Sequence, residues 1–338
     1  MCGIIGILGK HEAAPILVEA LKRLEYRGYD SSGIATVKDD GSIDRRRAVG
    51  KLLELQDKLV FEPLKGKAGI GHTRWATHGE PNEKNAHPHT RGAVSVVHNG
   101  IIENFLTLRE ELKCDGYKAE TDTDSETIAI LCSKFIDEGH EPLVAARKTL
   151  SKLTGSFAIA MLFEGHKNLI FAARSGSPLA VGYGKNEMYL GSDALALLPL
   201  TKKVAYLQEG DHAVLTREGA EIYDIKGSSV SRQITYLNQS INFHDKSGFS
   251  HFMEKEIHEQ PIALERAISS YLSDGTGKPT FNLLKKTNFT EVSRIILVAC
   301  GTAYYACYVA KYWIEKLAKI PVEIDIASEF RYREPPIE

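Results

Sequence analysis

The sequence predicts an α+β layered domain followed by the first elements of an α/β domain. Within the first 237 residues, strand patterns lie at both ends with helical patterns between them and no βαβ alternation, which is the order expected of a layered α+β fold. After residue 290 the order changes to an apolar strand, Arg294–Ala299, a glycine turn and a helical pattern, Tyr304–Leu317. That order is typical of parallel α/β domains. The 338 residues suffice for two domains of ordinary size.

The first half of the chain contains most of the predicted helices. An apolar strand, Ile4–Leu8, is followed by apolar residues at helical spacing from Ala13 to Leu24. A polar, glycine-rich loop, Leu24–Gly33, then leads into a strand, Ile34–Val37, and we interpret this loop as scaffolding beside a site. The remaining predicted elements here are helix Lys51–Val60, strand Ala68–His72, strand Ala93–His98, a helix that opens at Ile101 and runs to about Lys113, helix Thr127–Ile136 and helix Pro142–Leu150.

Short strands dominate the next part of the chain. They are predicted at Ser156–Phe163, Asn168–Ala173, Leu179–Gly184, Glu187–Ser192, Asp211–Thr216 and Glu221–Asp224. A polar stretch, Asn238–Gly248, predicts a linker, and a helical pattern follows from Ser250 to Leu272. We therefore expect a first domain at 1–237, a linker and helical segment at 238–290, and the start of a second domain at 291–338. After a second strand, Val322–Ile326, too few residues remain for a doubly wound sheet, so the second domain is expected to be incomplete.

Composition excludes several classes of function. Hydrophobic residues make up 43% and charged residues 25%, as in globular proteins with a sizeable core. The formal net charge is −2, so neither nucleic acid nor a membrane surface is a predicted partner, and the run Asp44–Arg47 is interpreted as a solvated face. The five cysteines, an odd number without metal-ligand spacing, favour a reducing compartment. With no membrane-length apolar stretch and no leader pattern, we expect a cytoplasmic protein.

The second residue is the first candidate for catalysis. If Met1 is removed, Cys2 carries a thiol and a free α-amine, which titrates at about 7.7–8.0. One residue then supplies both a nucleophile and its base. The structural alternative is a cysteine that merely belongs to a buried strand.

The segment after His72 is the second candidate. Thr73 to Pro81 places an arginine, a tryptophan and two threonines between a strand end and a glycine–proline turn, where a mobile lid is expected. Histidines at 72, 78, 87, 89 and 98 raise the question of a metal site. Their spacing matches no standard ligand set, so no metal and no other cofactor is predicted.

Two further segments offer polar groups at the ends of predicted elements. Asn99-Gly100 between apolar runs usually forms a hairpin turn, but here a helix is predicted to follow, which weakens that interpretation. Either Asp122 or Asp124 is expected to cap the helix that follows, a contribution of about 0.5–2 kcal/mol. One cap suffices, so the second carboxylate is available for another role.

Together these residues complete the inventory for acyl transfer. Cys2 would be the nucleophile, and the Asn99 amide with the Gly100 backbone would form an oxyanion hole. A free amino acid as substrate needs a cation for its carboxylate and an anion for its ammonium, and Arg74 and Asp124 would supply them. Trp75 and the loop to Pro81 would close over the site and exclude water.

Longer motifs resemble those of a single enzyme family. They read MCGI at 1–4, LEYRGYDS at 24–31, GHTRWATHG at 71–79, VHNGIIEN at 97–104 and ARSGSPL at 173–179, with ACGT at 299–302 and ASEFRYR at 327–333. The whole chain resembles the isomerising glutamine–fructose-6-phosphate aminotransferases, or glucosamine-6-phosphate synthases. The CGI motif alone marks only the wider class of N-terminal-cysteine amidotransferases.

This resemblance implies an N-terminal-nucleophile (Ntn) glutaminase domain, a four-layer αββα sandwich, followed by sugar-isomerase (SIS) domains. It implies that Cys2 attacks the amide of L-glutamine, that Asn99 and Gly100 form the oxyanion hole, and that ammonia passes to fructose 6-phosphate to give glucosamine 6-phosphate. Glutamine would be held by Arg74, Trp75, Thr77, His78 and Asp124. The resemblance further implies a homodimer of the full-length protein.

The sequence departs from the family pattern in the second domain. Ala303 replaces a serine of the Cys-Gly-Thr-Ser turn, so Thr302 and backbone N–H groups would have to bind the sugar phosphate. The phosphate loop and isomerisation residues of the family would lie beyond Glu338, so this chain is expected to be a fragment with glutaminase activity only. The alternatives are an N-terminal-cysteine amidotransferase with a phosphoribosyl or aspartyl acceptor, or a non-catalytic sugar-phosphate-binding regulator.

Overall fold

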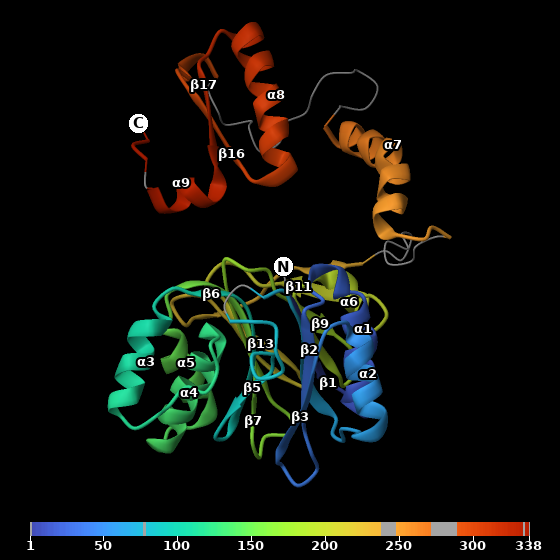
Figure 1. Ribbon diagram of the computed structural model, residues 1–338, viewed down its shortest axis with the longest axis vertical. Coiled ribbons are helices and arrows are strands. Elements are labelled where there is room, and N and C mark those ends of the chain that lie inside the picture. Colours follow the sequence, from blue (N-terminus) through green and yellow to red (C-terminus); the bar gives the residue numbers. More distant parts are fainter. Residues whose placement is uncertain (1, 77–78, 238–247, 272–288, 334, 338) are drawn as a thin grey trace. The chain divides into compact units, whose positions relative to one another are not determined.

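The chain folds into two compact units. The structure is a computed structural model that describes residues 2–76, 79–237, 248–271, 289–333 and 335–337. The first unit is Met1–His244 and the second is Asp245–Glu338 (Figure 1). The linker predicted at 238–248 lies almost entirely outside the described residues.

Two antiparallel sheets, whose strands are not in sequence order, form the centre of the first unit. The eight-stranded sheet has the order β15-β11-β9-β10-β1-β4-β2-β3. Its strands are β1 (Gly3–Leu8), β2 (Ser31–Val37), β3 (Ile43–Val49), β4 (Ala68–Arg74), β9 (Ala180–Tyr183), β10 (Met188–Gly191), β11 (Lys203–Tyr206) and β15 (Ile234–Tyr236). The seven-stranded sheet has the order β14-β13-β12-β8-β7-β6-β5. Its strands are β5 (His89–Arg91), β6 (Val94–Ile102), β7 (Gly155–Phe163), β8 (Ile170–Ser175), β12 (His212–Thr216), β13 (Gly219–Tyr223) and β14 (Ser229–Val230).

Helices cover the outer face of each sheet, which gives four layers (Figure 1). The first sheet carries α1 (Ala13–Lys22), α2 (Leu52–Phe61) and the short α6 (Ala194–Leu197), and the second carries α3 (Phe105–Cys114), α4 (Asp124–Asp137) and α5 (Pro142–Leu150). One apolar cluster lies between the sheets and others lie under the helices. The prediction of an α+β layered domain, and of an αββα sandwich, is confirmed.

Strand β1 shows why the opening sequence is so uniformly apolar. All six of its residues are buried. Ile4 and Leu8 face the second sheet, whereas Ile5 and Ile7 pack beneath α1. A strand with a sheet on one side and a helix on the other cannot alternate apolar and polar residues, because both faces exclude water. The residue just before this strand is therefore held at the end of a fully packed layer.

Strand β6 corrects one prediction. It continues through Asn99-Gly100 to Ile102, and helix α3 begins only at Phe105, not at Ile101. Gly100 pairs with Phe157 and Ile101 with Ser156, so the ladder with β7 is unbroken. Cross-strand pairing and the burial of Ile102 override the local turn preference of Asn-Gly.

Helix α4 corrects another prediction. It begins at Asp124, not Thr127, and its N-cap residue is Thr123, which makes no side-chain capping bond. Neither aspartate is the cap. The Asp122 carboxylate accepts from the Asn85 amide (3.2 Å), and the Asp124 carboxylate accepts from the backbone N–H of Ile102 (2.8 Å). Both carboxylates therefore accept hydrogen bonds from groups outside the helix and are not used as caps.

The arginine run also differs from its interpretation as a solvated face. It forms β3, an edge strand of the first sheet, which was not predicted. Arg45 donates to the carbonyl of Pro88 (3.1 Å), and Arg47 donates to those of Lys84 (3.0 Å) and Ala86 (2.9 Å). The run thus holds the segment that precedes β5. Strands β5, β11, β14 and β15 were also not predicted.

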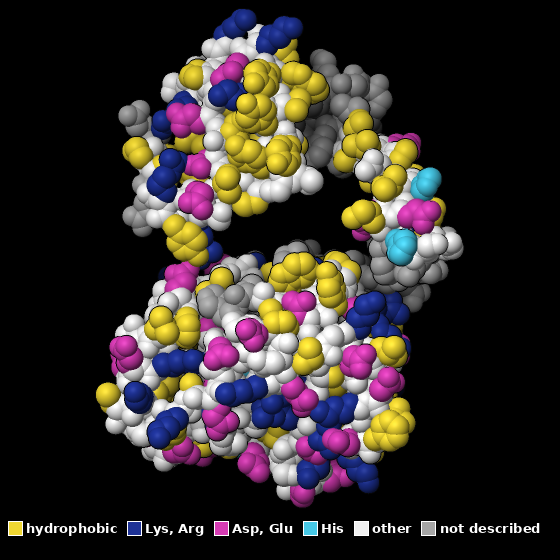
Figure 2. All heavy atoms as spheres, in the orientation of Figure 1, with side chains coloured by type: hydrophobic (Ala, Val, Ile, Leu, Met, Phe, Trp, Pro, Cys, Tyr) yellow, Lys and Arg dark blue, Asp and Glu magenta, His cyan; other side chains and the backbone are white. Residues whose placement is uncertain are grey.

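The second unit has a parallel pair of strands. Its elements are α7 (Phe252–Tyr271), β16 (Ile295–Ala299), α8 (Gly301–Ala318), β17 (Val322–Ile326) and α9 (Ala327–Arg333), with a short 3-10 turn at Phe289–Glu291. Ile295 to Ala299 pair in parallel with Val322 to Ile326, which confirms the predicted strand–turn–helix–strand order. Figure 2 shows hydrophobic side chains gathered over α8, where Tyr305, Trp313 and Leu317 are 67–81% exposed. Across the described residues, no helix is both long and apolar enough to cross a membrane.

Candidate active site

The ends of β1 and β4 bring the predicted nucleophile and cation together. Gly3 pairs with Thr73, so Cys2 lies beside Arg74 and Trp75. Cys2 and Arg74 line one small pocket together with parts of β6 and α4. Its lining residues are Cys2, Arg74, Trp75, His87, His98, Gly100, Thr123, Asp124 and Ser125.

The Cys2 thiol is tied to the backbone of Trp75. Its Sγ accepts from the N–H of Trp75 at 3.2 Å and lies 3.4 Å from the carbonyl oxygen of that residue. Burial raises the pKa of the Cys2 thiol, although the bond to Trp75 and the charge of Arg74 act in the opposite direction. A thiol in this environment needs a base close by to become a thiolate near neutral pH.

The loop predicted as scaffolding supports the same corner. This loop, Leu24–Gly33, contains a short 3-10 turn at Glu25–Arg27. Asp30 donates its N–H to the Arg74 carbonyl (3.0 Å) and accepts through its carboxylate from the N–H of Ala76 (2.8 Å). A Cβ on Gly28 would lie 2.6 Å from the Arg74 carbonyl carbon, so only glycine allows the loop to approach this closely.

Arg74 supplies the positive charge of the pocket. Arg74 is 3% exposed, and its guanidinium donates to the carbonyls of Gly79 (3.0 Å) and Glu80 (3.3 Å). Burial lowers the pKa of Arg74, while Asp30 and Asp124 counteract this effect. A guanidinium fork at the wall of a pocket is suited to a carboxylate.

Asn99 and Gly100 lie together in β6, opposite Cys2. The Asn99 amide donates through Nδ2 to the Cys2 carbonyl at 3.1 Å. Gly100 has φ +122°, and a Cβ there would lie 1.9 Å from the Ser156 carbonyl oxygen, so no side chain fits. Gly100 also lines the pocket, which is where a backbone donor to an oxyanion must lie.

Asp124 supplies the negative charge. It is 4% exposed and stands in the first turn of α4, where the helix dipole favours an anion. Its Oδ2 accepts from Ile102 N–H (2.8 Å) and its Oδ1 from the Ser125 hydroxyl (3.3 Å). The pocket therefore has a guanidinium and a carboxylate in its wall together with a thiol.

The other predicted site residues are placed differently. Trp75 is 46% exposed, and its ring meets that of Tyr29 edge-on, with 5.7 Å between centroids. Thr77 and His78 lie outside the described residues. Thr302 is exposed in the first turn of α8, in the other unit.

Sequence reasoning missed several residues of the pocket wall. His87, His98, Thr123 and Ser125 line the pocket, and none was assigned to the glutamine site. His98 and Ser125 stand next to assigned residues, at 99 and 124, so adjacency was a signal for them. Arg45 and Arg47 donate to the carbonyls on either side of His87, and no local sequence pattern predicts these contacts.

Burial keeps His72, His87 and His89 uncharged near neutral pH. Burial lowers the pKa of His72 to about 3, and it lowers the pKa of His87 and of His89 well below the usual range. The ring of His87 lies 4.0 Å from that of His72 and 4.6 Å from that of His89, between centroids. Within the described residues, no group of three or more His, Cys, Asp or Glu side chains is arranged to hold a metal ion.

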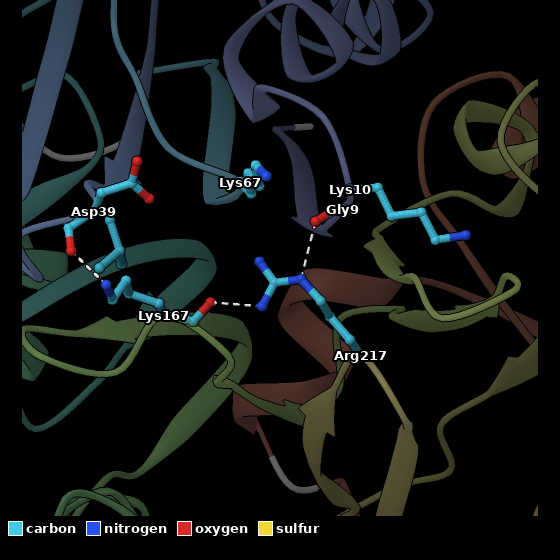
Figure 3. Close-up of a pocket in the computed structure, with 7 residues that line it drawn as sticks. Gly9, Lys10, Asp39, Lys67, Lys167 and Arg217 are labelled. Carbon is cyan, nitrogen blue, oxygen red and sulfur yellow. Dashed lines mark hydrogen bonds between the residues drawn. The ribbon is translucent and has the colours of Figure 1, made fainter.

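The pocket at Cys2 is small and a second hollow is larger. The Cys2 pocket encloses about 20 Å³, room for roughly one water. The larger hollow, about 460 Å³, lies at the opposite end of β1 (Figure 3). Arg217 there donates to the carbonyls of Gly9 and Lys167, both at 2.9 Å. Its described lining contains no cysteine, serine, threonine or histidine, in contrast to that of the Cys2 pocket.

Comparisons with known proteins agree with this geometry. A family model described as a glutamine amidotransferase domain matches residues 72–199, and a SIS domain model matches residues 288–338. The glutamine–fructose-6-phosphate aminotransferase (isomerizing) of Brucella suis biovar 1 is 53% identical over 337 residues, which are 100% of this chain and 55% of that protein. The enzyme of the same name from Zymomonas mobilis is 52% identical over 343 residues, with the same shares. The chain spans about half the length of the curated relatives it matches.

Solved structures show the fold. The glutamine phosphoribosylpyrophosphate amidotransferase of B. subtilis, complexed with ADP and GMP, gives a TM-score of 0.60 at 21% identity and covers 96% of this chain and 65% of that one. A structure described as the allosteric regulatory enzyme of purine biosynthesis gives 0.59 at 22% identity, with the same coverage. The first unit thus has the fold of the N-terminal-nucleophile amidotransferases. By sequence, the chain is similar over its whole length to the isomerising glutamine–fructose-6-phosphate aminotransferases.

Proposed function

We propose that this chain hydrolyses the side-chain amide of L-glutamine, with Cys2 as the nucleophile. The observation that most supports this proposal is that Cys2, Arg74, Gly100 and Asp124 line one pocket. They come from the N-terminus, the end of β4, the middle of β6 and the first turn of α4. Their chemistry matches a thiol nucleophile, an oxyanion site and a pair of charges for the two ends of an amino acid.

The first step needs the free α-amine of Cys2, and therefore the removal of Met1. That amine takes the thiol proton as Sγ attacks the amide carbon, and the negative charge moves to the amide oxygen. Asn99 Nδ2 and the backbone N–H of Gly100 are the proposed donors to this oxygen. Burial raises the pKa of the thiol, so a base on the same residue is the simplest source of thiolate.

The second half of the reaction returns the proton. The ammonium of Cys2 protonates the leaving nitrogen as the C–N bond breaks, which releases ammonia and leaves a thioester on Sγ. Water then attacks the thioester carbon, and the amine accepts one proton of that water. Breaking the C–S bond releases glutamate, and the proton returns to Sγ.

Recognition of glutamine rests on charge. Arg74 would bind the α-carboxylate and Asp124 the α-ammonium, so that the side-chain amide points to Cys2. The 20 Å³ of space is too little for an amino acid, and the segment from Trp75 through Thr77 and His78 is the proposed part that opens and closes. Such closure would exclude water during attack.

We infer that the whole protein delivers the ammonia to fructose 6-phosphate, which gives glucosamine 6-phosphate. Support comes from the names of the curated relatives and from the SIS match at 288–338. Residues 1–237 would be the glutaminase domain, 238–290 the connection and 291–338 the start of the sugar-isomerase domain. Thr302, at the start of α8, would contact the sugar phosphate. A homodimer of the full-length protein and a cytoplasmic location, in keeping with the free cysteines, complete this proposal.

The direct test is the release of ammonia and glutamate from glutamine by the purified chain. The Cys2→Ala variant should lose this activity to background, whereas Cys114→Ala, which removes an exposed cysteine, should retain it. Surviving activity in Cys2→Ala would mean that the nucleophile is wrongly assigned. Intact-mass measurement of the N-terminus should show that Met1 is absent from the active protein. For the acceptor, the full-length protein with fructose 6-phosphate should form glucosamine 6-phosphate.

A further inference from the structure

A buried histidine outside the pocket contacts the Asn99 amide. His72 in β4 is fully buried, and its Nε2 lies 3.0 Å from the Asn99 Oδ1 and 3.0 Å from the His98 carbonyl oxygen. Both neighbours are oxygen acceptors, so Nε2 must carry the proton and donate to both. His72 does not line the pocket at Cys2.

This contact decides which way the Asn99 amide faces. With Oδ1 toward His72, Nδ2 points to Cys2 and donates to its carbonyl at 3.1 Å. The reversed amide would set an N–H against the N–H of His72 and an oxygen against the Cys2 carbonyl oxygen. Both contacts would be repulsive. Nδ2 has two hydrogens, so the second remains for an oxyanion near Cys2.

Burial keeps this arrangement constant with pH. It lowers the pKa of His72 to about 3, even though the bonds to Asn99 and His98 act in the opposite direction. The ring is therefore neutral at any pH at which the protein would work. Its Nδ1 has no hydrogen-bond partner among the described residues, which agrees with a single tautomer protonated at Nε2.

A second histidine supports the opposite side of the pocket in the same way. The Ser125 hydroxyl donates its single proton to Asp124 Oδ1 at 3.3 Å, because a carboxylate can only accept. Ser125 Oγ then accepts from Nδ1–H of His98 at 2.8 Å. Ser125 is 3% exposed and His98 is 2% exposed. Together with the N–H of Ile102, this chain of bonds fixes the Asp124 carboxylate.

We propose that His72 and Ser125 are positioning residues, each acting on a different half of the site. His72 holds the Asn99 amide with its N–H groups toward Cys2, and Ser125, oriented by His98, holds the Asp124 carboxylate. This inference rests on the proposed glutamine hydrolysis. It predicts that the two residues control different kinetic constants, because an oxyanion donor acts in the transition state whereas Asp124 acts on bound substrate.

The test compares kcat and KM for glutamine in the whole chain. His72→Leu should lower kcat by at least about tenfold and by up to the 10²–10³-fold expected for losing an oxyanion donor, with KM changed less than about twofold. His72→Gln, whose amide N–H can replace Nε2–H, should recover most of that loss. Ser125→Ala should raise KM about tenfold, as expected for a hydrogen bond to a charged group, with kcat nearly unchanged.

Matched controls separate positioning from general damage. His212→Leu removes a buried histidine from β12, and Ser133→Ala removes a buried hydroxyl from the same helix as Ser125; both should behave as wild type. Alkylation of Cys2 by iodoacetamide should proceed at the wild-type rate in His72→Leu. A wild-type chain that releases no ammonia would refute the proposed function itself. If the wild type is active, three results would overturn the positioning roles. These are the same changes in kcat and KM in His72→Leu and Ser125→Ala, no rescue by His72→Gln, or loss of Cys2 alkylation.

Discussion

The two units respond differently to the same kind of sequence pattern. Both contain strands and amphipathic helices that were predicted within a few residues. The first unit buries its apolar faces in four clusters, which lie between its sheets, beneath its helices and between α3 and α4. In the second unit, Val322 is the only buried hydrophobic residue among those described, and α8 presents Tyr305, Tyr312 and Trp313 to solvent. An apolar sequence pattern is thus enough to form a helix or a strand. Only packing against a neighbouring layer fixes the position of that element closely enough to place catalytic groups.

The largest expected difference concerns independent folding. Residues 1–244 expressed alone should unfold cooperatively in denaturant and retain glutamine hydrolysis, because every layer of the site lies within them. Residues 245–338 alone should show no cooperative transition, since a two-stranded sheet with one covered face is marginal in water. Circular dichroism of both fragments measures this. A sharp transition in the second fragment would break the comparison.

A glycine comparison tests how exact the first unit is at its site. Gly100→Ala should destabilise the chain by about 4 kcal/mol or more, since it combines a positive φ with a Cβ 1.9 Å from the Ser156 oxygen. Gly116→Ala, also at positive φ but with nothing within 4 Å of its Cβ, should cost only about 1 kcal/mol. Urea unfolding midpoints provide both values. Equal losses of stability in the two variants would mean that the backbone of β6 adjusts easily at position 100.

Acid should weaken the first unit specifically. His72 is neutral when folded, with a pKa of about 3, and faces His98, His87 and Arg74, whereas an unfolded histidine titrates near about 6.5. Between these values the unfolded state binds more protons, so stability falls as pH falls. At pH 5 the loss is about 2 kcal/mol for each such histidine. Urea midpoints from pH 7.5 to 5 measure the slope, which His72→Gln should reduce; an unchanged slope would contradict a neutral buried His72.

The smallest effect is expected on the open face of the second unit. Trp313→Ser should change the free energy of unfolding by no more than about 0.5 kcal/mol, because the side chain is 67% exposed. Phe171→Ala, in the core of the first unit, should cost about 3–5 kcal/mol. Thermal unfolding of both variants gives the contrast. A large loss in Trp313→Ser would show that α8 is covered in solution.

Much of the site was accessible from the sequence because its chemistry is concentrated in a few residue types. Cys2, Arg74, Gly100 and Asp124 were predicted, and they line one pocket. The roles assigned to them remain proposals. His87 was not assigned, since its position depends on contacts across the fold that no local spacing encodes. Ser125 was also not assigned, although it stands next to Asp124.

The errors in the elements have a common physical cause. Asn99-Gly100 is a favourable turn sequence in isolation, yet the ladder with β7 draws it into a strand. The aspartates before α4 are favourable caps, yet Asn85 and the N–H of Ile102 compete for them. The arginines of β3 look solvent-exposed, yet carbonyls of another segment satisfy them. In each case a partner distant in sequence outweighed a local preference.

Strand β3 has a consequence for how molecules of this protein meet one another. As an edge of the eight-stranded sheet it has unpaired backbone groups that a strand from another molecule would otherwise extend. Arg45 and Arg47 place positive charges along that edge, while Arg46 is paired with the carboxylates of Asp44 and Glu62. An identical edge approaching it would meet like charges and would have to pull Arg45 and Arg47 from their carbonyl partners. The arginines that hold the segment of His87 would therefore also oppose the pairing of this edge with another strand.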